Sequence, residues 1–253
     1  MPRASRYLIE GYTYHLTHRC HDKRFLLKFS QERRAYREWL RIASKRYHVP
    51  IYGYCITSNH VHVIVHATDR HDVGRLMQLP SSAVARQLNI RKNHEGSVWE
   101  HPYQCTMIEN GRHLINCLSY VDMNMVRCGV VDHPKKWSWC GYDELNGTRQ
   151  RYRIIDIERL LQALNLNSHA ELSWRHNEAI RRQIELKNID RAPHWTEALA
   201  VGSKKFIANA RVQYQSRRSF IETDVETNYQ QNTWILREES AAYMPDFSQK
   251  SAL

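Results

Sequence analysis

Alternating apolar and polar residues in the first half of the chain predict four β-strands. The segment YTYHLTHR at residues 12–19 shows this alternation and is rich in aromatic and β-branched residues, which favour strands. The same pattern predicts further strands at 51–56, 60–66 and 103–108.

Helical spacing of apolar residues predicts two helical segments between these strands. The first extends from an N-cap at Ser30 to Tyr47. The second is expected as two pieces, one capped by Asp72 and one that begins at Pro80 and ends near Lys92. The resulting order, β-α-β-β-α-β, predicts an α+β fold of the ferredoxin-like kind, an antiparallel sheet with helices covering one face.

Another helix is predicted after the fourth strand, with Asn110 as its N-cap and Gly129 just past its end. Tyr120 and Asn124 lie off its apolar stripe at positions i and i+4, so they should project from the same side about one turn apart. The apolar stripe, which should face the core, consists of Leu114, Leu118, Val121 and Met125.

The composition shifts after the turn signal Asn146-Gly147. We therefore divide the chain into a catalytic domain at 1–145 and a mainly helical C-terminal extension at 146–253. Residues after about Arg218 are polar and are predicted to be irregular, and the last ten residues are predicted to be loosely ordered. Helices in the extension are expected at 156–164, 168–187 and 203–213.

Positive charge is concentrated in the first part of the chain. The formal net charge is +11, and residues 1–150 hold 22 Lys and Arg against 13 Asp and Glu, whereas 151–253 hold 15 against 13. A basic domain with 14 Tyr and 7 Trp suits a polyphosphate partner such as nucleic acid. A solvated basic surface without a partner is the alternative.

The six cysteines show no C-x-x-C spacing, which argues against a zinc ribbon or a disulfide framework. No apolar run approaches the length of a membrane span, and the N-terminal residues lack the apolar core of a signal peptide. A reducing cytoplasm is therefore the expected location.

The candidate chemistry begins with two histidines on the strand at 60–66. His60 and His62 are at positions i and i+2, so their imidazoles should point to the same face and could bind one divalent cation. With 15 histidines in the chain, chance alone supplies about one such pair. The setting, on an otherwise apolar strand directly after the polar turn Thr57-Ser58-Asn59, favours a metal site.

Tyr120 and Asn124 are the second candidate pair. A helical tyrosine is most often a packing residue. Here it lies on the helix that follows the sheet carrying the histidines, and the Asn124 carbonyl could bind the same cation. A phenol is a poor nucleophile at neutral pH, but a cation on a phosphate oxygen would allow it to attack a phosphodiester and form a covalent phosphotyrosine.

Three motifs together resemble a known family. The segments NHVHVIV, LSYVDMNMVRCGVV and HPKKWSWCGY are similar to those of single-tyrosine HUH transposases of the IS200/IS605 type, most closely the REP-associated tyrosine transposases. The resemblance covers about residues 3–145. It implies that His60, His62 and Asn124 are metal ligands for Mg²⁺ or Mn²⁺, and that Tyr120 is the nucleophile that becomes linked to a DNA 5′ phosphate.

The resemblance also implies single-stranded DNA as the substrate, near a hairpin, and a monomer or homodimer as the active species. Two residues depart from the family pattern: Met125 stands where proline is usual, and Cys140 where serine is usual. The candidates for DNA contact are Arg3, Arg6, Arg19, Lys23 and Arg24, with ordinary surface charge as their alternative.

Other functions fit parts of this pattern. A non-catalytic hairpin-binding regulator could share the fold, and a rolling-circle replication initiator could share the motif order. A zinc hydrolase would need a further protein ligand. Trp99 and Tyr103 could stack on unpaired bases or belong to the core.

Overall fold

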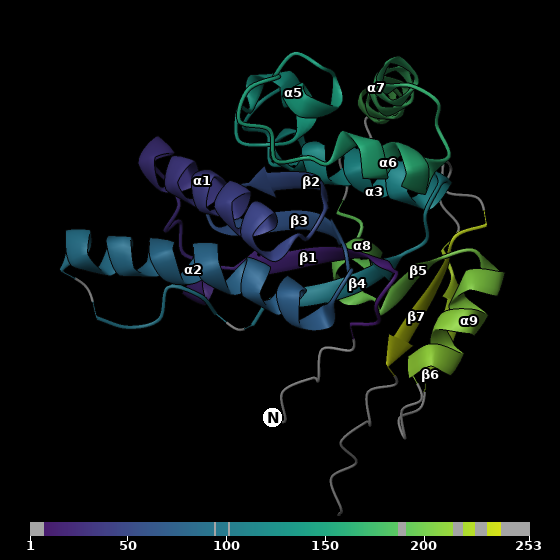
Figure 1. Cartoon of the computed structure of the whole chain (residues 1–253), viewed down its shortest axis with the longest axis horizontal. Coiled ribbons are helices and arrows are strands. Elements are labelled where there is room, and N and C mark those ends of the chain that lie inside the picture. The colour runs from purple at the N-terminus through teal and green to yellow at the C-terminus, as the bar shows by residue number, and fades with distance from the viewer. Residues whose placement is uncertain are drawn as a thin grey trace, which may run out of the picture.

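The computed structural model describes residues 8–93, 95–100, 102–186, 191–214, 220–225 and 232–238. Its central feature is a seven-stranded sheet with the strand order β2-β3-β1-β4-β5-β7-β6 (Figure 1). Within the described ranges, no helix has the length and apolar character needed to cross a membrane.

The first four strands form the predicted ferredoxin-like sheet. Strand β1 pairs antiparallel with both β3 and β4, and β2 pairs antiparallel with β3. The alternation of apolar residues places these strands to within a residue or so of their predicted limits. Their bounds are Thr13–Arg19 for β1, Ile51–Ile56 for β2, His60–His66 for β3 and Gln104–Ile108 for β4.

Helices α1 (Ser30–Tyr47) and α2 (Arg70–Lys92) lie side by side on one face of this sheet (Figure 1). Ser30 begins α1 but does not cap it, because Phe29 occupies the N-cap position. The predicted break at Pro80 is wrong, since α2 is one helix with Pro80 in its interior. Asp69 caps it by accepting hydrogen bonds from the backbone N–H groups of the first turn.

The helix that carries Tyr120 packs closely on β2. Helix α3 (Arg112–Asp122) and the short α4 (Asn124–Arg127) are separated by Met123, so the single helix predicted here is interrupted between Tyr120 and Asn124. Gly111, not Asn110, precedes α3. A Cβ at Gly53 would lie 2.7 Å from Leu118 Cδ2, so a glycine in β2 is needed for α3 to approach this closely.

The sheet continues into the C-terminal part of the chain. Strand β5 (Ala200–Gly202) pairs parallel with β4, and β7 (Trp234–Glu238) joins β5 to β6 (Phe220–Asp224). The prediction of irregular chain after Arg218 is therefore wrong for β6 and β7. The last ten residues lie outside the described ranges, and the division at residue 145 stays a prediction.

The other helices of this part follow the predicted pattern. Asp156 caps α6 (Ile157–Leu164) and Ser168 caps α7 (His169–Glu185) through their side chains, as their positions before helical runs indicate. Helix α9 (Lys204–Tyr214) matches the third predicted helix. The remaining short elements are the helices α5 (Tyr142–Leu145) and α8 (His194–Glu197) and 3-10 turns at His21–Lys23 and Pro134–Lys136.

Candidate active site

Strand β3 presents His60 and His62 toward α3, on the face of the sheet away from α1 and α2. Their ring centroids lie 4.8 Å apart. Asn124 Nδ2 is 3.0 Å from Nε2 of His62 and 3.4 Å from Nε2 of His60. The Tyr120 ring lies 6.3 Å from the His62 ring. The structure thus brings these four residues together, and their chemical roles stay predictions.

A chain of hydrogen bonds fixes the orientation of His62. The Trp195 carbonyl can only accept, so His15 Nδ1 donates to it at 2.7 Å. Burial lowers the pKa of His15 to about 4, so this histidine is neutral and its Nε2 accepts from His62 Nδ1 at 2.9 Å. The Nε2 lone pair of His62 is therefore directed toward Asn124.

The turn before β3 orients His60 in the same way. His60 Nδ1 lies 2.7 Å from Asn59 Oδ1 and 3.0 Å from Thr57 Oγ1. Because a carbonyl oxygen only accepts, Nδ1 carries the proton and Nε2 carries the free lone pair. Burial, followed by the Arg19 charge, lowers the pKa of His60 to about 3, and burial holds the pKa of His62 well below its ordinary value. Both imidazoles are neutral, which is the state that binds a metal.

The Asn124 amide supplies a test of whether a cation fits here. With Nδ2 donating to the histidines, the buried Oδ1 has no hydrogen-bond partner in the described part of the chain. Turning the amide over would direct this oxygen at the point where the two Nε2 lone pairs converge. Among the described residues, no group of three or more His, Cys, Asp or Glu side chains could hold a metal ion. His60, His62 and Asn124 offer two imidazole nitrogens and one amide oxygen, a donor set that a divalent cation could use with positions left open for a substrate.

Tyr120 is buried beside this donor set. Only 6% of it is exposed, and burial raises the pKa of its phenol, while the positive charge of Arg127 acts in the opposite direction. The guanidinium carbon of Arg127 lies 3.9 Å from the centre of the Tyr120 ring. The phenol is thus protonated at neutral pH and needs a neighbouring positive charge to act as a nucleophile.

Sequence reasoning missed three residues of this site: His15, Arg127 and Trp195. Arg127 lies three residues after Asn124, a helical spacing that could have pointed to it. His15 could have been found only with the register of β1 against β3, which places it opposite Ile64 and thus diagonal to His62. Trp195 contributes a main-chain carbonyl, which leaves no signal in the sequence.

The predicted DNA contacts have different positions. Arg3 and Arg6 lie outside the described residues. Arg19 ends β1 directly opposite His60, and Lys23 and Arg24 are exposed in the turn that follows. Beside them are two exposed aromatic side chains that the sequence did not single out, Phe25 at 65% and Phe29 at 58% exposure.

The two aromatic candidates for base stacking belong to the packed structure. Trp99 stacks on His18 with ring centroids 4.3 Å apart and donates a hydrogen bond to the Ser81 carbonyl, and Tyr103 is buried. The two departures from the family pattern, Met125 and Cys140, are buried core residues.

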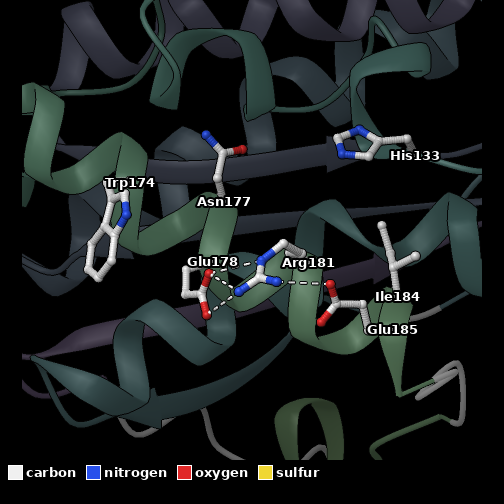
Figure 2. A pocket seen from close by; sticks show the side chains of 7 residues that line it. All are labelled: His133, Trp174, Asn177, Glu178, Arg181, Ile184 and Glu185. Atoms are coloured by element: carbon white, nitrogen blue, oxygen red, sulfur yellow. Dashed lines mark hydrogen bonds and ion pairs between the residues drawn. The ribbon is translucent and has the colours of Figure 1, made fainter.

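A separate hollow of about 490 Å³ lies along α7 (Figure 2). Its lining does not include His60, His62, Tyr120 or Asn124, and its charged groups are paired with one another. Arg181 donates to Glu178 at 2.7 Å and to Glu185 at 2.9 Å. This hollow is therefore not part of the candidate active site.

The geometry defines an α+β protein in which a histidine pair on a strand lies beside a tyrosine on a helix. Comparison with known proteins shows which family it resembles. Residues 9–124 match the family model "Transposase IS200 like". This segment, which contains His60, His62, Tyr120 and Asn124, is similar to IS200-like transposases, and the predicted resemblance to single-tyrosine transposases is confirmed at this level.

Two solved structures are similar to the chain. One is a REP-associated tyrosine transposase bound to a REP hairpin, at 17% identity and a TM-score of 0.47, covering 61% of this chain and 90% of that one. The other is a candidate transposase from Deinococcus radiodurans R1, at 17% identity and a TM-score of 0.31, covering 40% and 81%. No curated protein matches the chain.

Proposed function

We propose that this chain is a metal-dependent transposase that cleaves and transfers single-stranded DNA bearing a REP-like hairpin, through a covalent link between Tyr120 and a 5′ phosphate. One observation carries the proposal. The Asn124 amide lies within 3.4 Å of Nε2 of both His60 and His62, beside a tyrosine whose ring is 6.3 Å from His62.

His60, His62 and Asn124 would hold Mg²⁺ or Mn²⁺, which when bound withdraws charge from a phosphate oxygen and aligns the phosphodiester for in-line attack. The Tyr120 phenol then attacks phosphorus, so that a Tyr–O–P bond forms while the P–O3′ bond breaks. The phenol gives its proton to solvent, and the departing 3′ oxygen takes one up. Because one phosphodiester replaces another, a second 3′ hydroxyl can reverse the step and rejoin strands.

A single chain supplies all four residues, so the proposed chemistry does not require a homodimer. The positive charge beside the site suits a DNA backbone, since Arg19, Lys23 and Arg24 follow one another from the end of β1 next to His60. The exposed Phe25 and Phe29 in the same segment offer faces on which unpaired bases can stack.

The decisive experiment uses a 3′-end-labelled single strand carrying a hairpin and its flanks, incubated with the full chain and Mn²⁺. The wild type should form a covalent adduct that survives denaturing electrophoresis, and Tyr120→Phe should form none while it still binds the strand. Tyr152→Phe, at an exposed tyrosine, is the matched control and should form the adduct normally.

Two outcomes would contradict the proposal. Adduct formation by Tyr120→Phe would assign the nucleophile elsewhere. Tight binding by the wild type without any adduct, across hairpin substrates with varied flanks, would instead support a non-catalytic hairpin-binding regulator.

A further inference from the structure

Arg127, the last residue of α4, has a buried guanidinium that forms no ion pair with an acidic side chain of the described residues. Both of its terminal guanidinium nitrogens are buried, and no acceptor among the described residues meets hydrogen-bond geometry, although the Tyr120 side chain lies close enough to act on their charge. None of the ion pairs found within the described ranges includes it. Burial lowers the pKa of this guanidinium, and its charge in turn lowers the pKa of His60 and His62.

Another partly buried arginine of the chain shows the contrast. Arg33 Nη1 donates to the carbonyl oxygens of Leu27 at 2.8 Å and Lys28 at 2.6 Å. One terminal nitrogen of Arg33 thus has two acceptors, although its Nε has none among the described residues. Burying a positive charge without a counterion costs free energy. Such a charge is expected where a bound anion neutralises it in the functional state.

The position of Arg127 says where that anion would lie. The guanidinium carbon is 3.9 Å from the centre of the Tyr120 ring, and α4 also carries Asn124 at its first residue. An anion bound by these nitrogens would lie beside the Tyr120 ring and close to the short helix that carries Asn124. A planar guanidinium fork fits two oxygens of a phosphate group.

We propose that Arg127 binds the phosphate group that Tyr120 attacks and stabilises the negative charge that develops on it. This rests on the proposed function for the identity of the phosphate as a DNA phosphodiester. The anion site itself stands on the burial and the unpaired nitrogens of Arg127. Arg127 is thereby assigned as a substrate-binding residue of the reaction.

The first test needs no DNA. Thermal unfolding of the metal-free full chain is followed in inorganic phosphate and in chloride at equal ionic strength. The wild type should gain several degrees in phosphate, Arg127→Met should lose this gain, and Arg75→Met, at an exposed arginine paired with Asp72, should keep it. If Arg127→Met does not fold, Arg127→Gln replaces it. A phosphate response equal to that of the wild type would overturn the proposal.

The second test combines the variant with a change in the DNA. A methylphosphonate at the cleaved position removes the phosphate charge and should slow adduct formation by the wild type at least a hundredfold. Adduct formation by Arg127→Met should already be slow with the natural phosphate. The methylphosphonate should reduce its rate by a factor at least ten times smaller than in the wild type, because the side chain that binds the phosphate charge is absent. Equal effects in both proteins would overturn the proposal.

The two tests separate this inference from the proposed function. A wild type that forms no adduct but responds to phosphate only through Arg127 supports the anion site and contradicts strand transfer. A wild type that forms the adduct no faster than Arg127→Met contradicts the role of Arg127 and supports strand transfer.

Discussion

Glu144 and Asn124 are both buried polar side chains, but their surroundings differ. Glu144 has no exposed surface, and both carboxylate oxygens are used. Oε1 accepts from the Tyr54 hydroxyl at 2.8 Å, and Oε2 accepts from the backbone N–H of Ile154 at 2.7 Å and of Ile155 at 2.9 Å. Asn124 Oδ1 accepts nothing from the described residues.

The same contrast extends to the groups around them. The Glu144 cluster holds the segment after α5 against β2, and each partner in it is a donor that the carboxylate needs. Around Asn124, the nitrogen lone pairs of His60 and His62 share one amide, and the terminal nitrogens of Arg127 are unpaired. The buried carboxylate of Glu144 is thus completed by donors of the chain itself, whereas the Asn124 oxygen has no such partner among the described residues.

The largest effect on stability should come from Glu144→Ala. It leaves two buried N–H groups and the Tyr54 hydroxyl without their acceptor, so the free energy of unfolding should fall by about 4 kcal/mol. Adduct formation per folded molecule should not change, because Glu144 does not contact the site. Urea unfolding followed by circular dichroism measures the first quantity and gel analysis of the adduct the second.

Glu178→Ala is the matched control for Glu144→Ala. Glu178 pairs with Arg181 and Arg182 on the surface of α7, where solvent screens the charges, so its loss should have a much smaller effect. If the two variants lost equal stability, the structural role assigned to the Glu144 cluster would be wrong.

The next effect should be on metal binding. His60→Ala removes one of the two converging imidazoles, so Mn²⁺ affinity should fall about a hundredfold, with little change in stability since His60 is partly exposed. Isothermal titration of the full chain with Mn²⁺ measures this directly, without DNA.

His66→Ala provides the control on the same strand and the same face. His66 packs against Tyr52, with ring centroids 6.1 Å apart, and lies beyond the site. Its variant should bind Mn²⁺ like the wild type. Equal affinities of His60→Ala and the wild type would show that the converging lone pairs do not bind the metal.

The sequence predicted the parts of this molecule that depend on local periodicity. The alternation at 60–66 suffices to place His60 and His62 on one face, and the i, i+4 spacing of Tyr120 and Asn124 survives the interruption at Met123 because that residue keeps helical backbone angles. The ferredoxin-like order could be read because each of its strands carries its own apolar pattern.

The remaining parts depend on pairing between distant segments. Strand β5 is three residues long, too short for its sequence to show a strand pattern. It is a strand because it pairs with the edge of β4. The same holds for His15, whose contact with His62 follows from strand register, and for Trp195, whose carbonyl reaches the site through the position of α8. Residues such as His15 and Trp195, which orient a site residue from another part of the chain, can be identified only from the folded structure and not from sequence spacing.

The smallest predicted effect concerns the pH dependence of stability in the metal-free protein. The pKa of His15 is about 4 in the folded chain, against an ordinary value of about 6.5 when unfolded. Between these values the unfolded chain binds a proton that the folded chain does not, so stability falls as the pH falls from about 6.5 toward 4. At pH 5.5 the loss from His15 alone should be roughly 1 kcal/mol relative to neutral pH.

His15→Gln isolates this contribution. Glutamine still offers an acceptor to His62 Nδ1 but does not titrate, so the variant should lose roughly 1 kcal/mol less than the wild type between pH 7.5 and pH 5.5 in EDTA. Urea unfolding at the two pH values measures the difference. Equal losses in both proteins would mean that His15 is not held neutral by burial. Its neutral state directs the His62 lone pair toward Asn124, so that result would also contradict the proposal that the free site is oriented for a cation before one binds.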